Sequence, residues 1–164
     1  MKILPKIEDV KRTAAMGEYT VMPVAGEILA DFITPTEAFK ILKNASTHAF
    51  LLESAKTGDM WGRYSFLGFN PKAEITYKDG VFCNGEESYA AEDPAAELRK
   101  ILQKHKAPRI EYMPPFVGGL MGYFAYDYFG VCEKAARCED LDKGADFRDV
   151  DLMLFDKVIA FDHA

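Results

Sequence analysis

Apolar residues recur along the chain with two periods, one typical of helices and one typical of strands. Steps of three and four residues predict a helix over residues 7–16, a second helix after Thr34, and a third that begins at Asp93 and runs to about His105. The start of the second helix is well marked, because Thr34 can cap the amide of Glu37 and the Glu37 side chain can accept from the amide of Thr34. We expect each helix to bury one apolar face against the rest of the fold.

Short apolar runs between these helices predict strands. The runs occupy residues 19–29, 49–55, 62–68, 72–77, 81–83 and 149–163. Asp79 and Gly80 separate two of the runs and favour a hairpin, because both residues accept positive φ. The last run is long and strongly apolar, which is typical of a strand inside a sheet with partners on both sides. Residues 114–130 are rich in glycine and aromatic residues, so we expect their backbone to pack closely against another surface.

The composition supports one folded domain over residues 1–164 and argues against some classes of partner. Half of the residues, 49%, are apolar and 13% are aromatic, which is enough for a packed core. The sequence contains no apolar run long enough for a membrane helix, and its start turns polar too soon for a secretory signal, so we expect a cytoplasmic protein. The net charge of -6 comes from intermixed acids and bases, which predicts no nucleic-acid partner.

No motif in these residues predicts catalysis or a metal site. The chain has no Ser/His/Asp or Cys/His arrangement at a recognisable motif, and neither HExxH nor GxxxxGK[ST] occurs. The cysteines lack zinc-ligand spacing and are expected to be inert thiols; they are Cys83, Cys132 and Cys138. The acidic residues near the end do not fit a calcium loop or a tight cluster and are expected to be solvated; they are Asp149, Asp151, Asp156 and Asp162.

The LLES run at residues 51–54 is the most informative polar feature, because it places a carboxylate and a hydroxyl at the end of an otherwise apolar strand. Burying either group is costly unless it is paired. One interpretation is structural, with Ser54 an ordinary strand-end residue and Glu53 in a salt bridge with Arg63 or Lys56. The other is a ligand with an ammonium group, which Ser54 would bind while a nearby acid balances its charge. The residues alone leave both interpretations open.

Four longer motifs, taken in order, resemble one family. They are GEILADFITPTEAFKIL, FLLESAKTGDMWGRYSFLG, PPFVGGLMGYFAYD and DVDLMLFDKVIAFDH. In this order they resemble the N-terminal region of anthranilate synthase component I, over residues 21–163. The resemblance implies an α+β fold, a two-sheet sandwich with outer helices to which the N-terminal and C-terminal parts both contribute strands. It also implies that the catalytic residues and the ligands of a magnesium ion belong to a C-terminal part absent from these residues.

The resemblance further implies what the intact protein does. It would be a lyase of tryptophan biosynthesis that converts chorismate and ammonia to anthranilate and pyruvate, with ammonia delivered from glutamine by a separate amidotransferase subunit. The family is inhibited allosterically by L-tryptophan at a site around the LLES motif. Carried over to this chain, that site implies Ser54 as the principal ligand-binding residue with Leu52 and Glu53 beside it. Weaker candidates are Arg63, Tyr64 and Ser65.

Two other identities remain alternatives. Aminodeoxychorismate synthase component I, of the folate branch, shares the LLES-type strand, although the GRYSFLG run and the Asp162-His163 pair favour the anthranilate enzyme. A free-standing amino-acid-binding module is an alternative from another class. It predicts that these 164 residues bind tryptophan by themselves.

Overall fold

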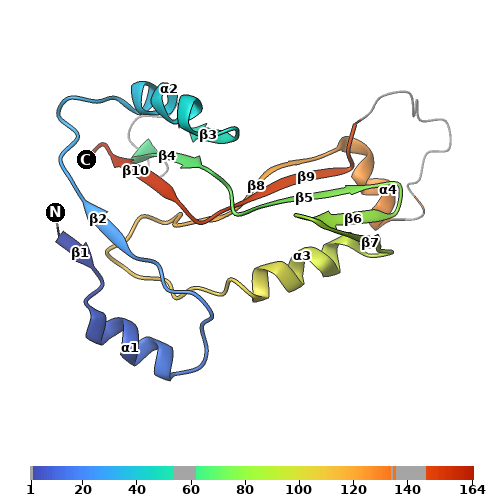
Figure 1. Ribbon diagram of the computed structural model, residues 1–164, viewed down its shortest axis with the longest axis horizontal. Coiled ribbons are helices and arrows are strands. Elements are labelled where there is room, and N and C mark those ends of the chain that lie inside the picture. The colour runs from blue at the N-terminus through green and yellow to red at the C-terminus, as the bar shows by residue number, and fades with distance from the viewer. Residues whose placement is uncertain (1, 54–61, 134, 136–146) are drawn as a thin grey trace.

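The protein is an α+β fold of antiparallel sheets, two of whose helices pack on sheet faces, which confirms the expected α+β class (Figure 1). The computed structural model describes residues 2–53, 62–133, 135 and 147–164. The strands of the described residues are β1 (Lys2–Leu4), β2 (Ala25–Glu27), β3 (Ala49–Leu52), β4 (Tyr64–Phe69), β5 (Ala73–Lys78), β6 (Val81–Asn84), β7 (Glu87–Ala90), β8 (Gly119–Phe124), β9 (Val150–Phe155) and β10 (Val158–Asp162). The helices are α1 (Ile7–Ala15), α2 (Pro35–Ala45), α3 (Pro94–Gln103), the short 3-10 helix η2 (Tyr126–Tyr128) and α4 (Phe129–Cys132).

Two larger sheets and one small sheet organise the chain. The strand orders are β10-β4-β3, β7-β6-β5-β9-β8 and β1-β2. Figure 1 shows the two larger sheets following one another along the long axis of the molecule. The chain passes between them twice, from β4 into β5 and from β9 into β10. The two crossings place residues far apart in sequence next to one another in the three-stranded sheet.

The second helix begins as its sequence predicts. The Thr34 side chain accepts from the Glu37 amide at 3.3 Å, and the Thr34 amide donates to the Glu37 carboxylate at 2.9 Å. This donation is the main cause that lowers the pKa of Glu37. Pro35 occupies the first helical position and Ala38 is buried, so α2 packs against the three-stranded sheet.

The core lies between α3 and the five-stranded sheet. Its buried members are Ile75, Tyr77, Phe82, Leu98, Ile101, Val150, Leu152 and Leu154. Leu98 and Ile101 come from one face of α3, three residues apart, as the predicted helical period requires. The predicted hairpin is also confirmed, since Asp79 and Gly80 have φ values of 49° and 81° between β5 and β6. A further strand, β7, extends this hairpin and was not predicted.

The glycine-rich segment forms β8, and the expected close backbone packing is confirmed. A side-chain carbon on Gly122 would overlap the carbonyl oxygen of Asp151 in β9. One on Gly118 would lie 2.8 Å from the carbonyl oxygen of Phe155. The absence of these carbons therefore allows β8 to approach β9 along most of its length.

Two strand predictions were wrong in extent. The run over residues 19–29 forms a strand only at β2, and Pro23 near its middle has no N–H to donate to a ladder. The run over residues 149–163 forms two strands in different sheets, separated at Asp156 and Lys157. The prediction of partners on both sides holds for β9, which lies between β5 and β8. In the described part of the chain, β10 pairs with β4 alone.

Candidate functional site

The residues with candidate binding roles meet at one end of the three-stranded sheet. Leu52 at the end of β3 pairs with Phe66 of β4, and Asp162 at the end of β10 pairs with Tyr64 of β4. The ends of β3 and β10 therefore flank the start of β4 on its two sides. We call this region the strand-end site, and it comprises Leu52, Glu53, Arg63, Tyr64, Ser65, Asp162 and His163.

A bidentate ion pair joins Arg63 to Asp162. The Nε of Arg63 donates to one carboxylate oxygen at 2.7 Å, and Nη2 donates to the other at 2.6 Å. Hydrogen bonding from Arg63 is the largest cause that lowers the pKa of Asp162, and the pKa of Arg63 rises in return. Both side chains are about half exposed, at 50% and 43%. The guanidinium also lies 5.1 Å from the centre of the Tyr64 ring, which adds a cation–π contact.

This pair corrects one of the structural interpretations of the LLES run. Arg63 bonds to Asp162, and its predicted salt bridge to Glu53 is not formed in the described residues. Glu53 is exposed just after β3. Ser54 and Lys56, which also entered the prediction, lie outside the described residues.

A buried serine and a histidine hold the main chain beside this ion pair. Ser65 is only 3% exposed, and its Oγ lies 2.8 Å from Nε2 of His163. The His163 amide donates to the carbonyl of Arg63 at 2.9 Å, which continues the pairing of β10 with the segment before β4. These two contacts fix the backbone of Arg63 relative to the end of β10.

An apolar face borders the polar groups on the same sheet. Phe66 lies between Tyr64 and Phe116, with ring centres 5.8 and 5.6 Å away. Phe50 packs over Gly68, where a side-chain carbon would collide with its ring. Leu52, which pairs with Phe66 at the end of β3, is 43% exposed. An exposed apolar edge beside a guanidinium and a carboxylate suits a small ligand that carries both an apolar ring and charges.

The structure therefore places four of the six predicted ligand-binding residues at one end of the sheet, with Leu52 and Tyr64 on one face and the buried Ser65 on the other, while Arg63 precedes β4 and reaches Asp162. Glu53 adjoins them in sequence, and Ser54 is outside the described residues. Sequence reasoning gave no role to Asp162 and His163, although both side chains contact predicted site residues. Only the register of β4 against β10 could have identified them, because nearly a hundred residues separate the partners.

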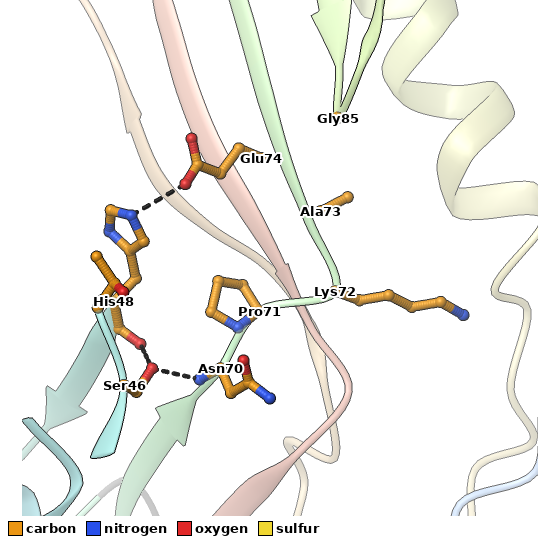
Figure 2. A pocket seen from close by; sticks show the side chains of 9 residues that line it. Ser46, His48, Asn70, Pro71, Lys72, Ala73, Glu74 and Gly85 are labelled. Atoms are coloured by element: carbon orange, nitrogen blue, oxygen red, sulfur yellow. Dashed lines mark hydrogen bonds and ion pairs between the residues drawn. The ribbon is translucent and has the colours of Figure 1, made fainter.

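Away from the strand-end site, a hollow lies where the chain crosses from β4 to β5 (Figure 2). It has a volume of about 410 Å³ and is lined by residues 46–48, 70–74 and Gly85. Figure 2 shows Nε2 of His48 paired with Glu74 at 2.9 Å. The Ser46 hydroxyl accepts from the Asn70 amide at 2.7 Å and donates to the carbonyl of His48. These bonds connect the residues before β3 with β5 and with the segment between β4 and β5. Because the polar groups bond to one another, the hollow offers few of them to a ligand.

Within the described residues, no three His, Cys, Asp or Glu side chains are close enough to hold a metal ion together. Cys83 is a free, half-buried thiol in the described part. Among the helices that the structure describes, none combines the length and apolar character needed to cross a membrane.

Comparison with known proteins identifies the relatives of this chain. A component 1 of anthranilate synthase from Acetivibrio thermocellus is 32% identical in an alignment 163 residues long, and the alignment covers 97% of this chain and 32% of that protein. The protein of the same name from Pseudomonas putida is 35% identical in an alignment 161 residues long, which covers 95% of this chain and 32% of that protein. No family model matches the sequence.

A solved structure agrees with these relatives. Anthranilate synthase component I from Streptococcus pneumoniae TIGR4 aligns with a TM-score of 0.51 and 26% identity, over 85% of this chain and 29% of that one. The chain spans about one third of the length of the curated relatives that it matches. By sequence and by fold, the chain resembles the N-terminal region of anthranilate synthase component I, and it corresponds to about one third of such a protein.

Proposed function

We propose that this chain is the N-terminal part of an enzyme that converts chorismate and ammonia to anthranilate and pyruvate, and that it carries part of a feedback site for L-tryptophan. The relatives named above support the reaction. The observation that supports the feedback role is the register of β3, β4 and β10, which puts Leu52 and Tyr64, two of the predicted ligand-binding residues, at the same end of the three-stranded sheet.

The chemistry of the strand-end site suits an aromatic amino acid. Tyr64 and Leu52 offer apolar contact to an indole ring, while Arg63 offers donors to a carboxylate. The ammonium group would be bound by Ser54 and balanced by Glu53. A charge-assisted hydrogen bond contributes about 1.5–3 kcal/mol, so one serine hydroxyl is enough to change tryptophan affinity strongly.

The reaction requires parts beyond these residues. We infer that the catalytic groups and the ligands of Mg²⁺ belong to the remaining two thirds of the intact protein. A second component, a glutamine amidotransferase subunit, would deliver ammonia. Tryptophan and chorismate would then oppose one another through an allosteric coupling of about 1–3 kcal/mol.

The test uses the full-length protein, with anthranilate fluorescence followed from chorismate, Mg²⁺ and ammonium salt, in the presence and absence of L-tryptophan. We expect anthranilate to form and tryptophan to suppress it. Ser54→Ala should raise the tryptophan concentration needed for half inhibition by about ten- to a hundredfold. Ser88→Ala, an exposed position on β7, is the matched control and should leave inhibition unchanged.

Other outcomes distinguish the alternatives. An aminodeoxychorismate product in place of anthranilate would assign the chain to the folate-branch enzyme and remove the basis for tryptophan feedback. Calorimetry of the 164-residue chain with tryptophan tests the free-standing module, because saturable heat from this chain alone would favour it.

A further inference from the structure

We propose that Asp162 is a positioning residue that holds Arg63 for recognition of a ligand carboxylate, and so makes the strand-end site selective for a free amino acid over its amide. The inference rests on the proposed function, because it concerns the same site. It adds a role for a residue outside the LLES and GRYSF motifs.

Asp162 occupies only some of the hydrogen-bond donors of Arg63. A guanidinium has five N–H groups in a planar fork. Asp162 accepts from Nε and from Nη2 with good geometry, at 2.7 and 2.6 Å. The two N–H groups of Nη1 and the second of Nη2 lie on the other edges of the fork. An edge of two parallel N–H groups matches the two oxygens of a carboxylate.

Two contacts restrict the direction in which the remaining edge of the Arg63 guanidinium points. An arginine that is half exposed samples many rotamers, and losing this freedom opposes ligand binding. The bidentate pair with Asp162 and the stacking on Tyr64 restrict the guanidinium before any ligand arrives. A half-exposed ion pair contributes little to stability, so its main effect here is on orientation.

Asp162 is itself held by the pairing of β10 with β4 and by a local backbone contact. Asp162 lies opposite Tyr64 in the β4–β10 ladder, and its Oδ1 also accepts from the amide of Ala164 at 3.2 Å. On the next residue, His163 bonds to the Ser65 hydroxyl and to the Arg63 carbonyl. Both members of the ion pair are therefore anchored by the same two strands.

A ligand at the strand-end site would meet a positive and a negative side chain side by side. Arg63 and Asp162 neutralise each other, so a bare anion gains less here than at an isolated arginine. A zwitterion can place its carboxylate on the free guanidinium edge and its ammonium toward the end of β3, away from Asp162. An amide of the same amino acid keeps the ammonium and the ring but loses the charged carboxylate. The ratio of the two affinities therefore reports the geometry of Arg63.

The experiment compares L-tryptophan with L-tryptophanamide as inhibitors of the full-length enzyme, each measured against the uninhibited rate of the same variant. In Asp162→Asn we expect tryptophan to inhibit about tenfold less well while tryptophanamide changes less than about twofold. Asp162→Glu should restore part of the selectivity. Asp156→Asn removes an exposed carboxylate between β9 and β10, and should leave both inhibitors and the basal rate unchanged.

Arg63→Lys is a second variant in case Asp162→Asn folds poorly. It keeps the charge but cannot bond to Asp162 and to a carboxylate through a planar fork, so we expect the same loss of selectivity. Equal weakening of both inhibitors in Asp162→Asn and Arg63→Lys would overturn the inference, because it would show a purely structural role. A wild-type enzyme that does not respond to tryptophan would overturn the proposed feedback role, and this inference with it.

Discussion

At the scale of residues, the ion pair between Arg63 and Asp162, which are distant in sequence, makes the stability of the fold depend on pH. Hydrogen bonding from Arg63 is the main cause that lowers the pKa of Asp162. A carboxyl whose pKa is lower in the folded state stabilises the fold above its unfolded pKa, about 3.9, and loses that contribution as the pH falls through the folded value. The pair is about half exposed, so solvent screening limits the effect.

We therefore expect Asp162→Asn to lower the free energy of unfolding by less than about 1 kcal/mol at pH 7. The difference from the wild type should shrink as the pH falls below about 4 and through the lowered pKa of Asp162, because the wild-type carboxyl then also becomes protonated. Urea unfolding at several pH values measures it. Asp156→Asn is the control and should show no such pH dependence. A difference that grew in acid would contradict the assigned direction of the pKa shift.

At the scale of elements, the backbone of β8 is held against β9 because side-chain carbons are missing. Gly122 pairs with Leu152, and its α-carbon faces the Asp151 carbonyl so closely that a methyl group has no room. Backbone atoms cannot move aside as a flexible side chain can, so a substitution there must separate the two strands. This strand pair covers part of the core that α3 closes from the other side.

Gly122→Ala should consequently destabilise the protein by about 1–3 kcal/mol or more through the overlap with β9, in addition to the backbone strain of its positive φ. Gly85→Ala is the matched control, because Gly85 also has positive φ but a side-chain carbon there meets no atom within 4 Å. It should cost only the backbone strain, about 1–2 kcal/mol. Chemical denaturation of both variants makes the comparison. Equal losses would mean that the close approach of β8 to β9 has no energetic consequence.

At the scale of the whole molecule, the large apolar side chains are divided between a packed core and an exposed set. Around the five-stranded sheet they are buried, but Leu29 and Phe32 between β2 and α2 are 87% and 100% exposed. Tyr126 in η2 is 97% exposed as well. Exposed apolar surface of this extent attracts apolar molecules from water.

The 164-residue chain is accordingly expected to bind the dye ANS in its folded state. The double substitution Leu29→Ser and Phe32→Ser should reduce the dye fluorescence and shift the thermal midpoint little, because neither side chain contributes to the core. Thr36→Ser, another exposed position, is the control. Unchanged fluorescence in the double variant would locate the dye elsewhere.

Local signals account for the elements that were predicted correctly. The capping box at Thr34 and the hairpin at Asp79-Gly80 depend on residues within a few positions of one another, so they can be recognised without knowing the fold. No local signal showed that the last apolar run forms two strands. Its break at Asp156 depends on β9 and β10 joining different sheets, which is a choice of distant partners.

The strand-end site shows the same division. The sequence by itself determined the resemblance to one family, the start of α2, the hairpin and the LLES and GRYSF residues as candidates, because each depends on short stretches of neighbouring residues. Tertiary structure alone decided that Arg63 pairs with Asp162 and Ser65 with His163, across nearly a hundred residues. The physical reason is register: a shift of β10 by one residue along β4 would turn each side chain to the opposite face, and no local pattern specifies that alignment.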